Sequence, residues 1–95
     1  MLYELSLEAV DDLENIFEYT LYQFGYDQAI KYLDTFDAIF DNLCLNPYLG
    51  RIRGELIAEL RSINHKNHLI FYRIKNNKII ILRILYGARD LPRYF

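Results

Sequence analysis

The sequence predicts an α+β fold in which a helical hairpin packs on a small, mainly antiparallel sheet, in the order β-α-α-β-β-β. Apolar residues recur at spacings of three and four through two stretches that Gly25 separates. From Ile57 onward the pattern changes to strand-like runs, and Asn76-Asn77 between two lysines suits a tight hairpin turn. The length of 95 residues predicts one domain spanning residues 1–95.

The first half begins with an extended segment, Tyr3 to Leu5, which we expect at an edge of the sheet. Ser6 follows as the predicted cap of the first helix, which Gly25 ends. The predicted apolar stripe of this helix consists of Val10, Leu13, Phe17, Leu21 and Phe24. Acidic residues are predicted to fill the outer faces of the helices, among them Asp11, Asp12, Glu14, Asp34, Asp37 and Asp41.

The second helix is predicted to begin at a cap formed by Asp27. Its apolar stripe consists of Ala29, Leu33, Phe36, Phe40 and Leu43. Asn46-Pro47 ends it, because a residue that precedes proline avoids the helical region.

Three strands are predicted for the second half, over residues 58–63, 68–74 and 79–86. Asn64 to Asn67 connects the first two. The last run is apolar on both faces, which predicts the central or best-covered strand.

Arg83 interrupts this last run. Strand alternation predicts that Arg83 shares a face with Ile81 and Leu85. Leu82 and Ile84 then lie on the opposite face. Two interpretations remain open for Arg83: its stem packs on the sheet while its charge is ion-paired or reaches water, or it belongs to an anion-binding sheet face. The arginines of that predicted face are Arg61, Arg73 and Arg83.

Charge is distributed unequally along the chain. Residues 1–45 contain ten acidic residues and one lysine, whereas residues 46–95 contain ten basic and three acidic residues. The net charge of -2 therefore conceals a basic half that suits an anionic partner and an acidic half that faces water or the basic half.

Several classes of function lack their motifs. His65 and His68 have no cysteine or carboxylate neighbours that would complete a metal site, and no glycine-rich phosphate loop is present, so we expect no metal and no cofactor. No apolar run is long enough to span a membrane. Cys44 falls in a helical apolar pattern as a reduced thiol, which suits the cytoplasm, and no signal peptide is visible.

The segment after the last strand places Arg89 near aromatic residues. Arg89 either pairs locally with Asp90 in an exposed turn or stands at the mouth of a groove, where arginine and aromatic groups together contact a partner.

His68 is either structural or a general acid or base, and core packing is the favoured interpretation for Tyr72 and Tyr86. The residues predicted to contact a partner are Arg61, Arg73, Arg83, Tyr86, Arg89 and Arg93.

Five segments together resemble a known family. They are Ser6-Leu7-Glu8-Ala9-Val10-Asp11-Asp12-Leu13, Asn46-Pro47-Tyr48-Leu49-Gly50-Arg51, Leu60-Arg61-Ser62, His68-Leu69-Ile70-Phe71-Tyr72-Arg73 and Ile84-Leu85-Tyr86-Gly87-Ala88-Arg89-Asp90-Leu91. In this order they resemble the ParE branch of the RelE/ParE superfamily, the toxins of bacterial type II toxin–antitoxin pairs. The resemblance implies a small cytoplasmic toxin that inhibits DNA gyrase, blocks replication and is neutralised by a bound antitoxin.

We expect the antitoxin to lay an amphipathic segment on exposed apolar surface and to meet the basic sheet with acidic residues. The resemblance predicts no sequence-specific binding to DNA.

RelE-like members of the superfamily instead cut messenger RNA in the ribosome, and this is the alternative function. The resemblance offers that chemistry a partial set of residues, which are Arg61, His68, Arg89 and Tyr94. Glu59 falls where a lysine is expected, and this inverted charge weakens the case for a nuclease. A third alternative is a non-toxic binding module that keeps the fold.

Overall fold

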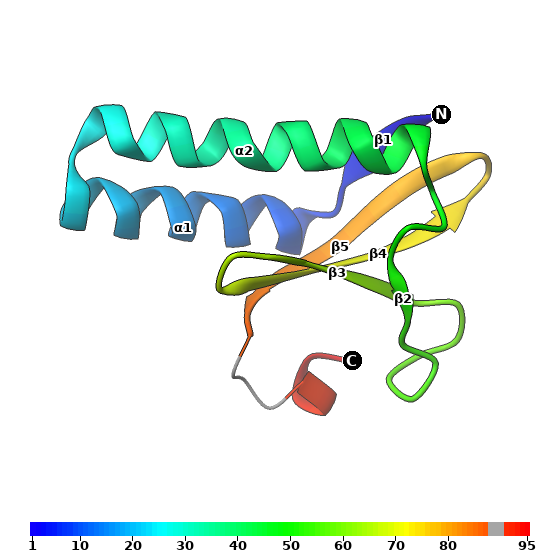
Figure 1. The fold of residues 1–95 in the computed structure, drawn as a ribbon. Helices are drawn as coiled ribbons and strands as arrows, with labels where there is room; N and C mark the ends of the chain where they lie inside the picture. The colour runs from blue at the N-terminus through cyan, green and yellow to red at the C-terminus, as the bar shows by residue number, and fades with distance from the viewer. Residues whose placement is uncertain (88–90) are drawn as a thin grey trace.

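The computed structural model describes residues 1–87 and 91–95 and has five strands in one sheet, in the order β1-β5-β4-β3-β2, with two helices on one face (Figure 1). The elements are β1 (Leu2–Leu5), α1 (Leu7–Phe24), α2 (Tyr26–Leu45), β2 (Arg51–Ile52), β3 (Arg61–His65), β4 (His68–Lys75), β5 (Lys78–Tyr86) and a 3-10 helix, η1 (Leu91–Tyr94). The predicted α+β fold is confirmed, with β2 as an additional two-residue strand.

The helical hairpin turns at Gly25. Its φ of 88° lies in the left-handed region that favours glycine, and it both ends α1 and precedes α2. Asp27 therefore lies within the first turn of α2, where a carboxylate is favourable, and the prediction that it caps this helix was wrong. The cap of α1 at Ser6 is confirmed, because its Oγ accepts a hydrogen bond from Ala9 N at 3.0 Å.

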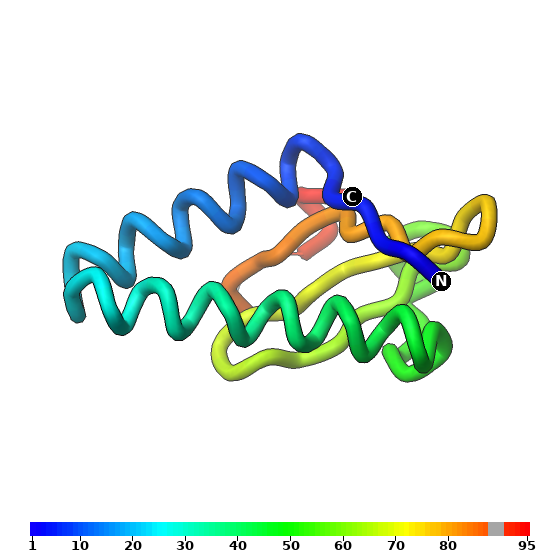
Figure 2. Tube along the Cα trace, turned by 90° about the horizontal axis from the view of Figure 1, so that it is seen from above, coloured from blue at the N-terminus to red at the C-terminus, as the bar shows by residue number. Residues whose placement is uncertain are grey.

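The apolar stripe of α2 packs into the core as predicted, with Phe36 and Phe40 fully buried. The stripe of α1 was predicted about one position out of register. Ala9 and Thr20 are its buried residues, whereas Phe24 is 68% exposed. Figure 2 shows why Phe24 is exposed: the closed end of the hairpin extends beyond the sheet, so residues near Gly25 have no strand to cover.

The sheet is antiparallel except for its first strand. β1 pairs in parallel with β5 and forms an edge, as predicted. β4 is the middle strand, and β5 lies between β1 and β4, so β5 is an interior strand but not the central one. β3 begins at Arg61, later than predicted, because residues 54–59 form turns, with Glu59 at a φ of 64° that a strand does not adopt. The hairpin turn at Asn76-Asn77 is confirmed by φ values of 51° and 60°.

The two faces of the sheet bury different clusters. The helix face, which carries Ile70, Tyr72, Ile79, Ile81 and Ile84, packs against α1 and α2. The open face carries Phe71 and Leu85. Partly buried side chains from the loop after β2 and from the C-terminus cover this second face, and these are Leu56, Ile57, Leu91, Tyr94 and Phe95.

A β-bulge in β5 changes the predicted alternation. Tyr72 pairs with Ile81 and Phe71 pairs with Arg83, so Leu82 has no partner in β4. The extra residue moves Arg83 to the open face with Phe71, because residues paired across an antiparallel ladder share a face. The prediction that Arg83 shares a face with Ile81 was therefore wrong.

In the described parts of the chain, no helix has both the length and the apolar character required to span a membrane.

Candidate functional site

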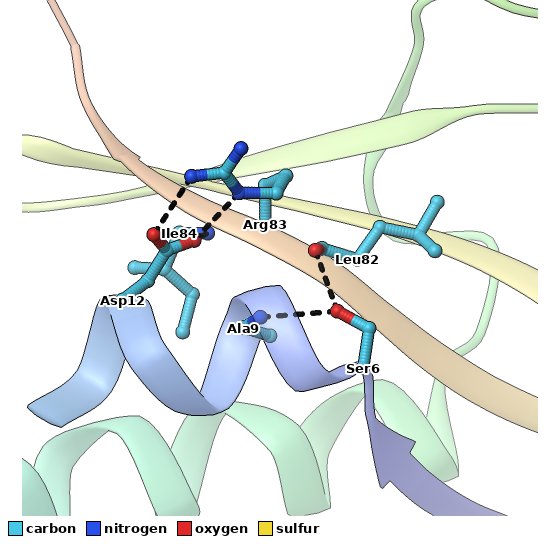
Figure 3. A network of polar contacts seen from close by, with 6 residues as sticks. All are labelled: Ser6, Ala9, Asp12, Leu82, Arg83 and Ile84. Carbon is cyan, nitrogen blue, oxygen red and sulfur yellow. Dashed lines mark hydrogen bonds and ion pairs between the residues drawn. The ribbon is translucent and has the colours of Figure 1, made fainter. Parts of the chain in front are cut away.

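Arg83 forms a bidentate ion pair with Asp12 of α1 (Figure 3). Its Nε and Nη2 donate to the two carboxylate oxygens at 2.9 and 2.8 Å, and the side chains are 22% and 11% exposed. These hydrogen bonds raise the pKa of Arg83 above its ordinary value, against the opposing effect of burial. The Arg83 guanidinium also lies 5.1 Å from the ring centre of Tyr94, so this charge links α1, β5 and η1.

Asp12 additionally accepts a hydrogen bond from the backbone N of Ile84 at 2.8 Å (Figure 3). β1 ends opposite Ile81, and beyond that point β5 has no neighbouring strand on this side. Side chains at the start of α1 supply the missing partners, because Ser6 Oγ donates to the carbonyl of Leu82 at 2.8 Å. The prediction that Asp12 lies on the outer face of its helix was wrong. Its spacing of three from Ala9 was the signal that could have placed it on the buried face.

The other two strand arginines do not lie beside each other on one face. Arg61 pairs with Tyr72 of the helix face, so the next residue of β4, Arg73, points to the open face. The Nη1 of Arg61 donates to the carbonyl of Gly50 at 2.9 Å, and its guanidinium lies 5.0 Å from the ring centre of Tyr48. The structure thus divides the predicted arginine face: Arg73 and Arg83 share the open face, whereas Arg61 holds the loop before β2.

That loop is fixed on a buried tyrosine. The hydroxyl of Tyr72 donates to the carbonyl of Pro47 and accepts from Gly50 N, both at 2.8 Å. Tyr72 is fully buried, and burial raises the pKa of its hydroxyl. The segment from Asn46 to Arg51 is therefore a structural clamp between the helices and the sheet.

The two histidines lie beneath α2. His68 Nδ1 is 3.0 Å from the hydroxyl of Tyr32, and His65 Nε2 is 2.8 Å from Thr35 Oγ1. The Thr35 hydroxyl donates its single proton to the carbonyl of Tyr32, so it accepts from His65. Burial, and secondarily the charge of Lys66, lowers the pKa of His65.

A groove of about 970 Å³ opens between the overhanging hairpin and the edge of β5. We call it the hairpin groove. Its aromatic lining consists of Tyr19, Phe24, Tyr32, Tyr86 and Tyr94. Tyr19, Phe24 and Tyr86 are 65%, 68% and 50% exposed. Asp12, Asn15 and His68 add polar groups to the wall.

Sequence reasoning proposed Tyr86 as a contact residue and Tyr94 for the nuclease set, but it missed Tyr19 and Phe24. The expectation that Tyr86 packs in the core was wrong, because Tyr86 is 50% exposed. Phe24 had been assigned to the core stripe. Of the remaining predicted residues, Arg93 is exposed in η1. Arg89 lies outside the described residues.

The described members of the nuclease set do not all lie together. Arg61 pairs with Tyr72, four residues along β4 from His68, a separation of about 14 Å along the strand direction. Tyr94 packs against the cluster of Phe71 and Leu85 and also lines the hairpin groove, as His68 does, so Arg61 is the member that lies apart.

Comparison with known proteins gives consistent results. The chain matches the family described as the ParE toxin of the type II toxin–antitoxin system parDE over residues 3–91. It is 33% identical over 92 residues to Toxin ParE1 of Mycobacterium tuberculosis, covering 96% of this chain and 94% of the relative. Toxin ParE3 of Caulobacter vibrioides is 32% identical over 80 residues, covering 84% of this chain and 80% of the relative.

A solved structure from the chromosomal ParDE toxin–antitoxin system of P. aeruginosa superposes with a TM-score of 0.76 at 23% identity. It covers 88% of this chain and 92% of that one, which shows a common fold. The family match and the relatives, together with this fold, show that the chain belongs to the ParE toxin family of type II toxin–antitoxin systems.

Proposed function

We propose that this chain stops growth by inhibiting DNA gyrase, which blocks replication in the cytoplasm, and that a cognate antitoxin neutralises it by direct binding. The position of Arg61 is the observation that carries this choice over messenger RNA cleavage. Its guanidinium is bound to the carbonyl of Gly50 and stacked on Tyr48, about 14 Å along the sheet from His68. Stabilising the transition state of phosphodiester cleavage requires cations and an acid–base group converging on one phosphate.

The hairpin groove supports the proposed neutralisation. Its walls combine exposed aromatic rings with polar groups, which is the surface that an amphipathic segment of a partner protein recognises. Tyr19 and Phe24 stand on one wall and Tyr86 on the other, so an apolar stripe entering between them contacts both. We propose this groove as the antitoxin site, with Arg61, Arg73, Arg83, Tyr86, Arg89 and Arg93 retained as proposed contacts with gyrase or with the antitoxin.

A supercoiling and cleavage assay with purified gyrase, plasmid DNA, ATP and this protein tests the proposal. We expect loss of supercoiling with accumulation of linear DNA, and recovery when the antitoxin is added in equimolar amount. Unchanged supercoiling by a preparation that still binds antitoxin would contradict it. Ribosomal messenger RNA cleavage by the same preparation would then establish the nuclease alternative.

Growth on expression alone separates both toxic mechanisms from a binding module. We expect arrest that a co-expressed antitoxin relieves. Normal growth with the folded chain present at high level would favour the non-toxic alternative.

A further inference from the structure

The two layers of the molecule carry opposite charge. α1 and α2 contain nine acidic residues and only Lys31 as a base. The part of the chain after α2, which includes four of the five strands, contains ten basic and three acidic residues. Because the helices cover one face of the sheet (Figure 1), the acidic layer lies opposite the open face.

Some of the cations in the sheet layer are neutralised internally. Arg53 pairs with Glu55 at 2.8 Å, Lys78 pairs with Glu4 at 2.6 Å, and Arg83 pairs with Asp12. By contrast, no ion pair joins Arg51, Arg73 or Lys75 to an acidic residue within residues 1–87 and 91–95.

The strand register puts these three cations on the open face. Arg51 pairs with Ser62, which pairs with Phe71 of the open face. Arg73 and Lys75 follow Phe71 at spacings of two and four in β4 and therefore share its face. We call Arg51, Arg73 and Lys75 the open-face cations. The strand spacing separates β2 from β4 by about 10 Å, and Arg73 from Lys75 by about 7 Å.

We propose that the open-face cations bind the phosphates of duplex DNA without reading its sequence. This rests on the proposed function, because the duplex in question is the DNA that gyrase holds. The surface would turn the basic layer of the toxin toward that DNA and the acidic helices away from it. None of the three residues belongs to the partial nuclease set.

Duplex DNA fits this surface better than an acidic protein segment does. Protein contacts draw most of their energy from apolar or aromatic anchors that fill pockets. On the open face the apolar centre is already covered by the chain itself, through residues such as Leu56 and Phe95. Phosphates need only cations spaced along the backbone, because counterion release drives their binding.

Fluorescence anisotropy with a labelled 30-base-pair duplex of arbitrary sequence, titrated with the full chain at several salt concentrations, tests the proposal. Three phosphate contacts predict a slope of about -2.7 for log K against log salt, which is about a 40-fold loss of affinity between 50 and 200 mM. Arg73→Gln and Lys75→Gln should each change the slope to about -1.8, a loss of about 12-fold over the same range. Lys31→Gln removes an exposed cation from the acidic layer and should leave the slope at the wild-type value.

Equal slopes for the wild type, Arg73→Gln and Lys75→Gln would overturn the proposal, and so would the absence of duplex binding at 50 mM salt. Binding of a glutamate-rich peptide that depends on Arg73, without duplex binding, would make the open face a protein-docking surface and overturn it as well. The supercoiling assay on the same preparation separates the two proposals. Gyrase inhibition without duplex binding would contradict only the proposed DNA-binding surface. Duplex binding without gyrase inhibition would contradict only the proposal that gyrase is the target.

Discussion

At the scale of single residues, Asp12 joins α1 to β5. It accepts hydrogen bonds from Arg83 Nε, Arg83 Nη2 and Ile84 N, and its side chain is 11% exposed. Asp12→Ala leaves a largely buried guanidinium and a strand N–H without their acceptor. We expect the free energy of unfolding to fall by about 3 kcal/mol, measured by urea denaturation.

Asp11→Ala is the matched control, because Asp11 is the adjacent helical carboxylate and is exposed. We expect it to change stability by less than about 0.5 kcal/mol. If both variants lost the same unfolding free energy, the contacts of Asp12 with Arg83 and Ile84 would not stabilise the fold.

His65 predicts a dependence of stability on pH. Burial, followed by the charge of Lys66, lowers its pKa in the folded protein below the ordinary 6.5, so the unfolded chain binds its proton more readily. The contribution of His65 is fully present above about pH 6.5 and is lost as the pH falls through the folded-state pKa. We expect unfolding midpoints measured from pH 8 to 5 to fall across this window.

His65→Gln removes this titration while leaving a polar side chain near Thr35. The variant should lose part of the slope below about pH 6.5, whatever its stability at pH 8. An identical slope in both proteins would assign the pH dependence to other groups.

The sequence predicted the position of some charged side chains but not of others. The acidic residues of the helices were predicted to lie on the outer faces, which is right for Asp11 and wrong for Asp12. The partner of Asp12 is Arg83, 71 positions later, so the helical pattern alone carried only a weak signal for the pair. The interpretation of Arg83 as an ion-paired residue was available from the sequence, but its partner was not.

At the scale of elements, helical periodicity predicted both helices, and strand-like runs predicted the strands after Ile57. The bulge at Leu82 was not predictable, since apart from Arg83 the run from Ile79 to Tyr86 is apolar on both faces, and such a pattern does not fix which residues share a face. β2 was missed because two residues carry no periodicity. Its position follows from the clamp on Tyr72, which is a tertiary contact.

The clamp itself gives a prediction at this scale. A Cβ added to Gly50 would lie 2.6 Å from Cε1 and from the hydroxyl oxygen of Tyr72, and 3.0 Å from the carbonyl of Ser62. Tyr72 is fully buried and has no room to retreat. We therefore expect Gly50→Ala to lower the unfolding free energy by about 1–3 kcal/mol in urea titrations, through overpacking and weakened clamp hydrogen bonds.

Gly54→Ala is the control for that substitution. An added Cβ there meets only Ile52 Cγ2 at 4.0 Å, which is ordinary contact. Its stability should stay within about 0.5 kcal/mol of the wild type. If Gly50→Ala were as stable as Gly54→Ala, the close packing of the loop on Tyr72 would be contradicted.

At the scale of the whole molecule, the sequence predicted the layers but not their relative extent. Whether residues near Gly25 are covered depends on where the sheet ends, and no local pattern reports this. The overhang makes Phe24, which was predicted as core, part of the groove lining, together with Tyr19, for which the sequence predicted no role. The candidate antitoxin site therefore depends on how the helices and the sheet pack together, which the sequence does not show. The difference in charge between the two halves, by contrast, follows from the sequence directly.

The hairpin groove predicts a selective loss of antitoxin binding. Tyr19 lines the groove, whereas Tyr22, one turn further along α1 and 87% exposed, does not. Because aromatic anchors dominate binding, we expect Tyr19→Ala to raise the antitoxin Kd about 10- to 100-fold, measured by calorimetry. Tyr22→Ala should change it by less than about threefold. Equal effects of the two substitutions would place the antitoxin elsewhere.

A last prediction concerns Arg89, one of the residues proposed to contact gyrase or the antitoxin. It follows β5 in the basic half of the chain, and reversing its charge opposes contact with an anionic partner. We expect Arg89→Glu to reduce growth arrest on expression without lowering the melting temperature. Lys31→Glu makes the same change of charge on the acidic layer and should remain fully toxic. A folded and fully toxic Arg89→Glu would exclude Arg89 from the toxic contact, whereas loss of toxicity in both variants would indicate a response to net charge rather than to a defined surface.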